Sequence, residues 1–276
     1  MSPDDPDQIA SGQRGPAPTG PAQAGGVQSV ERGIRLLELL ADAGGEMTLS
    51  RLAEAAGLPM PTIHRLLGTL VQCGYVRRRP DRRYALGSRL IRLGETAGRA
   101  LGTWARPRLA ELTEATGETA NLAVLEGSQL VYVAQAPSPH SMRMFTEVGR
   151  RVPAHSTAVG KAVLALLPEE QALDLVRSAG MPAQTEHTIT TPDALIDELR
   201  QIRRTGHAID AQEQELGVRC LAVAVPTADT PTAVSVSGPQ DRMQRIGEAA
   251  LLPALRRAAE AVAEELTGRG QRGTRS

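Results

Sequence analysis

The sequence has few cysteines and no long apolar run. Cys73 and Cys220 lie far apart in the chain and have no partners at metal-ligand spacing, so we expect neither a disulfide framework nor a metal site. The longest apolar stretches, such as residues 162–167, are far shorter than the roughly 18 residues of a membrane span. Residues 1–5 have neither the basic nor the apolar part of a signal peptide. We therefore expect a globular, cytoplasmic protein with no membrane association.

Lysine is almost absent, because Lys161 is the only one in the chain, and arginine takes its place. The net charge is zero over 276 residues, but the basic charge is clustered. Residues 60–99 contain nine arginines against Asp81 and Glu95, a local net charge of +7. An abundance of arginine can reflect coding bias alone, whereas its clustering indicates a surface for an acidic partner.

Length and composition predict two domains with disordered ends. A chain of 276 residues with 41% hydrophobic residues can bury two cores. Residues 1–26 contain five prolines and five glycines and no apolar periodicity, so we expect a disordered tail there and another over 268–276. Between the tails we expect a first domain over 27–88, a connector helix over 89–102 and a second domain over 103–267.

The first domain begins with three predicted helices. Val30, Ile34, Leu37 and Leu40, with Gly33 and Leu36 beside them, keep helical spacing from residue 27 until Gly44-Gly45 ends the run. Thr48 can cap a short second helix over 49–56, which Gly57 ends. Pro61 suits the start of a third helix. Its expected apolar stripe consists of Ile63, Leu66, Leu67, Leu70 and Val71.

A basic hairpin follows the helices. Val76 on one side and Tyr84 and Leu86 on the other bracket residues 77–83, which carry a Pro-Asp turn and five arginines. Helix, glycine turn, helix and basic hairpin together predict a winged helix-turn-helix, whose third helix enters the major groove of DNA. We expect that helix to face DNA with Met60, Thr62, His64, Arg65 and Thr69, and the wing to face phosphates with Arg78, Arg79 and Arg82. A small helical domain with a solvated basic face is the alternative.

The second domain alternates short strands with helices, which is typical of an α+β fold with an antiparallel sheet. Its last two predicted strands segregate side chains by size. Cys220, Ala222 and Ala224 share one face with Ala233, Ser235 and Ser237, while the other face carries leucine and valines. A face of small and partly polar residues leaves room for a ligand, so we expect a pocket there in which the two serine hydroxyls find a partner. The helix after His155, capped by Ser156 or Thr157, could cover it and turn its backbone N–H groups near Ala158 and Val159 to an anion.

Several stretches carry a resemblance to a known family. Residues 27–33, 58–67 and 84–87 in the first domain, and residues 117–123, 153–162 and 235–239 in the second, resemble the IclR family of bacterial regulators. The resemblance covers about residues 27–266. It implies a GAF-like effector-binding domain, and a small carboxylate held by Ala158, Val159, Asp210, Cys220, Ser235 and Ser237.

Within the family, the pattern around Met142-Arg143-Met144 and the set of Asp210, Cys220 and the two serines are most similar to repressors of allantoin and glyoxylate catabolism. The chain departs from that pattern at Ala158-Val159, where a Gly-Ala pair is typical. Asp210 could instead be a loop carboxylate, and Cys220 a small core residue.

The resulting hypothesis is a repressor of a catabolic operon, with purine-ureide degradation as the first candidate. It would bind a near-palindromic operator as a homodimer or homotetramer and release it on binding glyoxylate, allantoate or allantoin. A regulator of another carboxylate or aromatic-acid pathway is the alternative. A hydrolase built on His155-Ser156 or Cys220 lacks a G-x-S-x-G elbow, so we expect no catalytic residues and no cofactor. An interaction module with a vestigial DNA domain is a third alternative.

Overall fold

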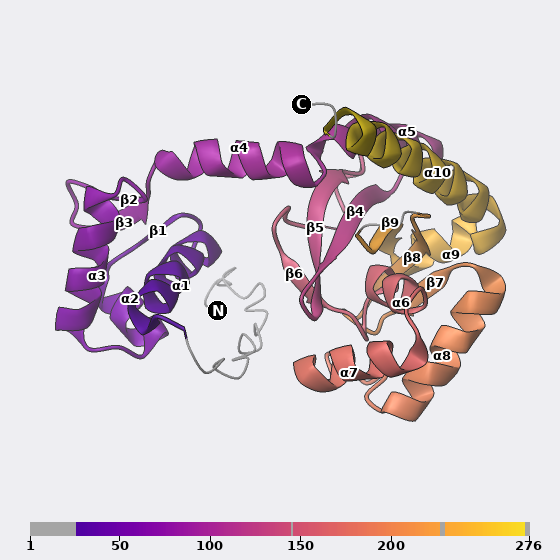
Figure 1. The fold of residues 1–276 in the computed structure, drawn as a ribbon, viewed down its shortest axis with the longest axis horizontal. Coiled ribbons are helices and arrows are strands. Elements are labelled where there is room, and N and C mark those ends of the chain that lie inside the picture. Colours follow the sequence, from indigo (N-terminus) through magenta and orange to yellow (C-terminus); the bar gives the residue numbers. More distant parts are fainter. Residues whose placement is uncertain (1–25, 145, 227–229, 274–276) are drawn as a thin grey trace, which may run out of the picture. The chain divides into compact units, whose positions relative to one another are not determined.

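The computed structural model of the chain describes residues 26–144, 146–226 and 230–273. The chain divides between Ser88 and Arg89 into two compact units, each of which is described by itself (Figure 1). The predicted tail over 1–26 lies outside the described residues except for Gly26. Among the described helices, none is both long and apolar enough to span a membrane.

The first unit is a winged helix-turn-helix. From Gly26 onward, its described residues form three helices and a three-stranded antiparallel sheet in the order β1-β3-β2. Their bounds are α1 Gln28–Asp42, β1 Glu46–Met47, α2 Leu49–Ala56, α3 Met60–Gln72, β2 Val76–Arg78 and β3 Tyr84–Leu86. The three predicted helices and the hairpin are all present, and β1 is an addition that sequence periodicity did not indicate.

Local sequence sets the bounds of α2. The Thr48 side chain accepts a hydrogen bond from the Arg51 backbone N–H at 3.4 Å, and Gly57 ends the helix at φ 63°. Leu52 points into a core that includes Leu36, Leu40, Ile63 and Leu67. Helix α1 is present as predicted and buries Leu36 and Leu40, while Val30 and Ile34 of the same helical run are exposed. The face of α1 that meets the core is the one with Gly33, Leu36 and Leu40.

The second unit begins with the predicted connector helix, α4 (Arg89–Leu101), none of whose side chains is buried. A six-stranded antiparallel sheet follows, in the order β6-β5-β4-β9-β8-β7. Its strands are β4 Thr119–Glu126, β5 Gln129–Ala136, β6 Arg151–Pro153, β7 Ala208–Ala211, β8 Val218–Ala224 and β9 Thr232–Pro239. The α+β prediction is confirmed. Strands β6 and β7 were not predicted because each has only three or four residues.

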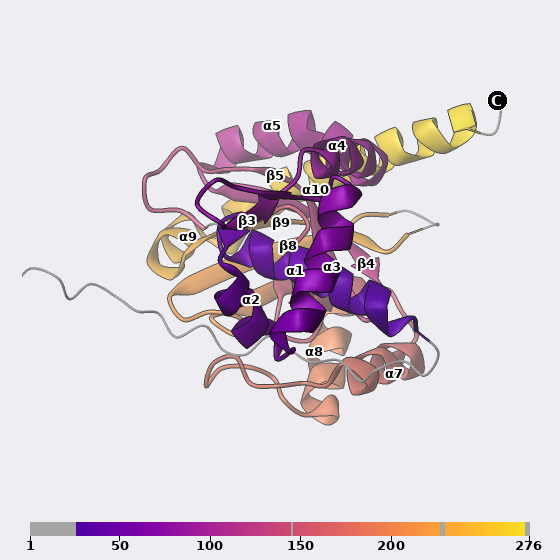
Figure 2. The same cartoon turned by 90° about the vertical axis from the view of Figure 1, so that its left-hand side faces the viewer.

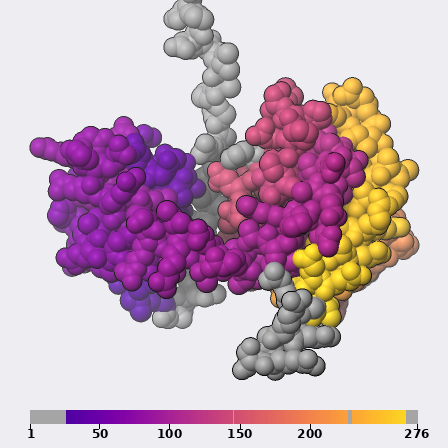
Figure 3. Space-filling view, turned by 90° about the horizontal axis from the view of Figure 1, so that it is seen from above, coloured from indigo at the N-terminus to yellow at the C-terminus, as the bar shows by residue number. Residues whose placement is uncertain are grey.

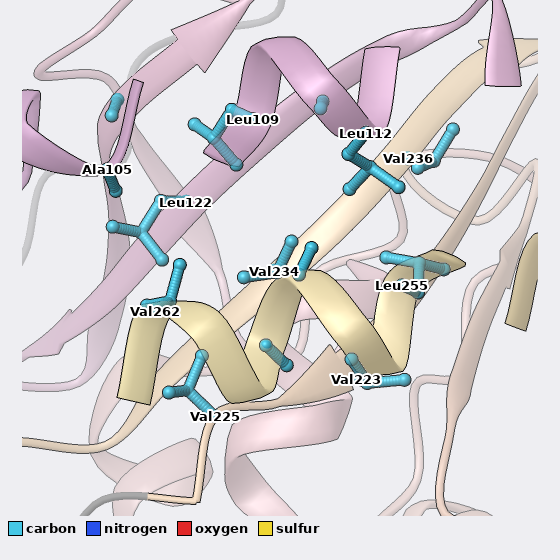
Figure 4. Close-up of a cluster of buried hydrophobic side chains, with 14 of the residues drawn as sticks. Ala105, Leu109, Leu112, Leu122, Val223, Val225, Val234, Val236, Leu255 and Val262 are labelled. Atoms are coloured by element: carbon cyan, nitrogen blue, oxygen red, sulfur yellow. The ribbon is translucent and has the colours of Figure 1, made fainter. Parts of the chain in front are cut away.

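Helices cover both faces of the sheet. On one face, η1 (Thr103–Ala105), α5 (Arg106–Thr116) and α10 (Glu248–Gly273) pack on the bulky side chains of β8 and β9. Helices α5 and α10 lie side by side there (Figure 2), and α10 forms a continuous ridge on the surface of this unit (Figure 3). Figure 4 shows Leu109 and Leu112 of α5 and Leu255 and Val262 of α10 around Val234 in this core.

The other face of the sheet meets a second core, built with α6 (Ala158–Leu164), α7 (Glu169–Ala179) and α8 (Pro192–Thr205). The small residues Ala222 and Ala233 point to this side, so the predicted segregation of side chains by size is present.

Gly247 separates the last two helices of the described residues, α9 (Gln240–Ile246) and α10. Helix α10 continues past residue 268, where the second tail was expected to begin, and ends at Gly273. Each residue added to a formed helix gains a backbone hydrogen bond, and a glycine costs only about 1 kcal/mol in this setting.

Candidate functional site

Helix α3 presents the side chains that were predicted to face DNA. Met60, His64, Arg65 and Thr69 are exposed, and Thr62 is half-buried at the edge of the core. Ile63 and Leu67 on the opposite side are fully buried. The Thr69 hydroxyl donates to the Arg65 carbonyl at 3.3 Å, so its proton is already used within the helix. The face is polar and accessible, and its contact with DNA stays a prediction.

The wing arginines are exposed, but two of them already have acidic partners. Arg82 lies at the tip with φ 64°, and its backbone N–H closes the predicted Pro-Asp turn on the Arg79 carbonyl at 3.1 Å. Glu46 on β1 pairs with Arg79 at 3.3 Å and with Arg83 at 2.9 Å. Arg77, Arg78 and Arg82 have no ion pair among the described residues, in contrast to Arg79 and Arg83.

In the second unit, strand register brings the predicted effector residues into rows across the sheet. Asp210 on β7 pairs with Cys220 on β8, Cys220 pairs with Ser237 on β9, and Ser237 pairs with Thr119 on β4. A second row, two residues away on the same face, runs from Ala222 through Ser235 to Asn121. Side chains directly opposite in such pairs lie about 5 Å apart. Asp210 is therefore a strand residue and not the loop carboxylate of the alternative interpretation.

Helix α6 closes this face of the sheet at its N-terminus. Thr157 is the N-cap, as predicted, and its hydroxyl oxygen accepts a hydrogen bond from the Gly160 backbone N–H at 3.2 Å. A Cβ atom at Gly160 would lie 2.3 Å from the Ala154 carbonyl oxygen. Glycine is required there because the helix passes directly against the preceding chain, and this approach sets Ala158 and Val159 over the rows.

A cavity of about 40 Å³ lies between α6 and the sheet. All six predicted effector residues line it. Seven further residues that sequence reasoning missed line it as well. They are Tyr132, Met144, Thr146, Thr157, Gln214, Glu215 and Val218.

The two serines differ in their surroundings. The Ser237 hydroxyl accepts a hydrogen bond from Asn121 Nδ2 at 3.1 Å, and Gln135 in turn donates to Asn121 Oδ1 at 3.1 Å. The Ser235 hydroxyl, although 2% exposed, has no hydrogen-bond partner among the described residues. Asn121 already donates a hydrogen bond to Ser237, so the expected ligand contact stays a prediction for which Ser235 is the hydroxyl without a partner.

The segment between β5 and β6 contributes to the cavity wall through Met144 and Thr146. Its path is fixed by hydrogen bonds from two sides. The Thr119 hydroxyl donates to the Met144 carbonyl at 3.4 Å, and Arg242 donates to the Met142 carbonyl at 3.0 Å. Arg242 is itself held by the buried Glu118 at 2.7 Å.

A buried charge cluster lies next to the cavity. Lys161 on α6, which is 1% exposed, pairs with Glu213 at 2.5 Å and with Glu198 on α8 at 3.0 Å. The Glu213 backbone N–H donates to Asp210 Oδ1 at 2.7 Å, so the cluster adjoins the cavity carboxylate directly. Burial raises the pKa of Asp210 to about 7, against the opposing effect of the backbone hydrogen bond. Burial also raises the pKa of Glu213, which Lys161 partly offsets.

Comparison with known proteins decides the family. The model of the IclR helix-turn-helix domain matches residues 29–80, and that of the bacterial transcriptional regulator IclR C-terminal domain matches residues 96–264. The chain belongs to the IclR family.

Among its relatives, the transcriptional repressor IclR of Escherichia coli K12 is 38% identical over 239 residues, which cover 84% of this chain and 87% of the relative. The repressor AllR of the same organism is 29% identical and covers 83% and 86%. An IclR homologue from Microbacterium hydrocarbonoxydans, solved with 4-hydroxybenzoate, superimposes with a TM-score of 0.74 at 25% identity, over 87% of this chain and 99% of the other.

These relatives support membership of the IclR family more firmly than the specific similarity to repressors of allantoin catabolism. The identity to AllR is moderate and lies below that to the E. coli IclR repressor, so an allantoin pathway does not follow from it. The chain is a ligand-responsive transcriptional regulator of the IclR family, and its relatives are regulators rather than enzymes.

The side chains proposed for a hydrolase do not form a catalytic arrangement. His155 Nε2 lies 3.2 Å from the Pro182 carbonyl, while the Ser156 hydroxyl donates to Gln214 at 2.8 Å, so the two residues are engaged elsewhere. Burial raises the pKa of the Cys220 thiol well above its ordinary value, which disfavours the reactive thiolate. Within the described residues, no group of three or more His, Cys, Asp or Glu side chains could hold a metal ion.

Sequence reasoning missed Glu46 and the cluster around Lys161. One signal for the cluster was present, since the only lysine of the chain stands in the run Val159-Gly160-Lys161-Ala162-Val163. A charged residue inside such an apolar helix requires a buried partner. The partners themselves, Glu198 and Glu213, lie 37 and 52 residues further along the chain, and only the fold brings them together.

Proposed function

We propose that this IclR-family protein represses a catabolic operon and releases its operator on binding a small carboxylate in the cavity beneath α6. The observation that carries the proposal is the row of Asp210, Cys220 and Ser237 beside Ser235, which lines a cavity of about 40 Å³. Among glyoxylate, allantoate and allantoin, a cavity of this size favours glyoxylate. Purine-ureide degradation stays one candidate pathway.

The proposed ligand contacts use the polar atoms that are free of partners. Ser235 supplies a hydroxyl, and Tyr132, whose hydroxyl has no hydrogen bond among the described residues, supplies a second donor. Ala158 and Val159, at the start of α6, supply apolar side chains to the cavity wall.

Calorimetry with glyoxylate, allantoate and allantoin tests the effector. Wild-type protein is compared with a Ser235→Ala/Ser237→Ala double variant. Ser178→Ala is the matched control, because Ser178 lies on α7 with its hydroxyl bonded to the Leu175 carbonyl of its own helix. Saturable binding that is lost in the double variant and kept in the control supports the site. A double variant that binds as well as wild type contradicts it.

A second candidate is an aromatic acid. It is favoured by the relative solved with 4-hydroxybenzoate and by Tyr132, whose ring lines the cavity. Binding of 4-hydroxybenzoate in the same calorimetric series, without binding of glyoxylate, would favour this alternative.

For DNA, we infer that Met60, Thr62, His64, Arg65 and Thr69 of α3 approach base edges. In the wing, Arg78, Arg79 and Arg82 approach phosphates. Arg65→Ala is expected to cost about 1–3 kcal/mol on the cognate operator and to relax its specificity. Arg78→Ala should weaken cognate and random DNA alike and lower the salt slope by about 1. If both variants lost equal affinity for the operator and for random DNA, α3 would not contact base edges.

Regulation follows from linkage between the two sites. A ligand that prefers one arrangement of the effector domains changes operator affinity by the coupling energy, commonly about 1–3 kcal/mol. A homodimer or homotetramer would match a near-palindromic operator. Sedimentation with and without operator DNA measures that stoichiometry, and a complex containing one chain per operator would contradict it.

A further inference from the structure

The cavity is poor in positive charge for a site proposed to hold an anion. Of the thirteen described residues that line it, none is lysine, arginine or histidine, whereas Asp210 and Glu215 are acidic. A carboxylate entering this cavity therefore meets charge of its own sign. At short range and with little water between them, two such charges repel strongly.

Asp210 is the group that the ligand would meet. It is 2% exposed, and its Oδ1 atom accepts the backbone N–H groups of Glu213 at 2.7 Å and Gln214 at 3.3 Å. Its Oδ2 atom has no hydrogen-bond partner among the described residues and is free to meet a ligand in the cavity that Asp210 lines.

The charges around Asp210 leave it without a cation of its own. Among the described residues, Lys161 is the cation that acts on Asp210, and Glu213 and Glu198 already share that ammonium group. Arg219, the neighbour of Cys220 on β8, pairs with Glu248 at 2.9 Å, and His155 meets the Pro182 carbonyl. The titratable or charged groups nearest Asp210 are Tyr132 on β5, Lys161 on α6, Glu198 on α8, Glu213 and Glu215 after β7, and Cys220 on β8.

Asp210 and the adjoining cluster of Lys161, Glu213 and Glu198 together hold three carboxylates and one ammonium group, and they can relieve this excess negative charge by binding a proton. Burial raises the pKa of Asp210 to about 7, while Lys161 acts in the opposite direction only as the weakest cause. Asp210 therefore titrates close to neutral pH, where a nearby anion can change its protonation state.

We propose that Asp210 takes up one proton from solvent when a small carboxylate binds, so that ligand and Asp210 together carry one negative charge instead of two. The proton lies on the Asp210 carboxyl group, which donates a hydrogen bond to the ligand carboxylate. No covalent bond forms or breaks. The protonation state of Asp210 thus determines whether the cavity can bind an anion. This inference rests on the proposed carboxylate effector.

The sign of the pH effect follows from this linkage. An anion beside Asp210 raises the pKa of Asp210 further, so the complex binds more protons than the free protein. Affinity should be constant below pH 7 and fall about tenfold for each pH unit above it.

Calorimetry between pH 5.5 and 8.5 tests the proposal, with glyoxylate, allantoate and 4-hydroxybenzoate as probes and the tightest binder carried through. Each pH is measured in two buffers of different ionisation enthalpy, phosphate and Tris at the alkaline end, because the difference in observed heat gives the number of protons taken up. We expect this number to approach one near pH 8. Asp210→Asn should bind without proton uptake and equally well at pH 6 and pH 8. Glu215→Gln, which changes the other acidic residue of the cavity, should keep the wild-type pH slope.

The outcomes distinguish a failure of the proposed role of Asp210 from a failure of the proposed carboxylate effector. Wild-type binding that is independent of pH and takes up no proton overturns the role of Asp210 and leaves the carboxylate sensor intact. Failure of all three carboxylates to bind at pH 5.5 overturns the carboxylate effector itself. Should Asp210→Asn fail to fold, the wild-type heats in the two buffers still decide the question.

Discussion

Replacing Lys161 by methionine should destabilise the second unit more than any single surface change. Lys161 is 1% exposed and Glu213 is 6% exposed, so the substitution leaves the Glu213 carboxylate buried without its cation. Its Oε2 atom already lacks a hydrogen-bond partner. Glu198 contributes little to the loss, because its side chain is 30% exposed and stays hydrated.

The magnitude follows from the burial of both partners. Removing one member of a buried ion pair costs about 3–5 kcal/mol, because the remaining charge is uncompensated. Methionine keeps most of the aliphatic contacts of the lysine stem, so this electrostatic term dominates. The cost should be larger at pH 8 than at pH 5. Without Lys161 the already raised pKa of Glu213 rises further, and a neutral glutamic acid no longer carries the cost of a buried charge.

Urea unfolding followed by the fluorescence of Trp104 measures the effect, since this is the only tryptophan of the chain and lies in the second unit. A Lys161→Met/Glu213→Gln double variant should recover most of the loss, because the cation and the carboxylate then leave together. Arg177→Met is the matched control. It removes a positive charge from an exposed pair with Asp174 and should change stability by less than about 0.5 kcal/mol. A single variant within about 1 kcal/mol of wild type at pH 8 would refute the reasoning, as would a double variant no more stable than the single one.

Three further substitutions test other parts of the structure. Glu46→Gln removes the closer acidic partner of Arg79 and Arg83 and leaves them Asp81 at 3.9 Å, so binding to random DNA should tighten with a steeper salt dependence in a filter-binding titration; unchanged binding would mean that these arginines do not reach phosphates. Thr48→Ala removes the N-cap of α2 and should cost about 1 kcal/mol, seen as several-fold faster amide exchange in that helix, whereas wild-type protection would dismiss the cap. Gly160→Ala forces a Cβ atom onto the Ala154 carbonyl and should cost at least about 1–3 kcal/mol by Trp104 fluorescence; a neutral substitution would show that α6 can move away from the strand.

Sequence periodicity was sufficient for the long elements and failed for the short ones. Helices α2, α3 and α5 carry their own start and stop signals, such as Thr48, Pro61 and Gly117. Strands β1, β6 and β7 have two to four residues, too few for an alternation to be recognised. Their positions depend on pairing with strands that are distant in sequence, and this information is absent from any local window.

The candidate site was predictable to the extent that side-chain size alternates along β8 and β9. That alternation alone places Cys220, Ser235 and Ser237 on one face of the sheet. The resemblance to the family added Asp210, which local periodicity would have left in a loop. Neither source could indicate that Asn121 serves Ser237, or that Lys161 is shared by two glutamates, because these contacts join segments 37 to 116 residues apart.

The buried carboxyl group of Asp210 lowers the stability of the second unit and, by our proposal, also responds to the charge of the ligand. Asp210 has a pKa of about 7 in the folded protein against an ordinary value of 3.8, so the folded state binds more protons than the unfolded state between these values. Stability from this group is therefore lost as pH rises from about 4 to 7, and the gap corresponds to about 4 kcal/mol. A buried carboxylate with this cost would be replaced by an apolar residue if packing were its only role. Its position at the cavity, with Oδ2 unpartnered among the described residues, gives the cost a functional reason, because a group that is unstable as an anion and stable as an acid responds to the arrival of a second anion.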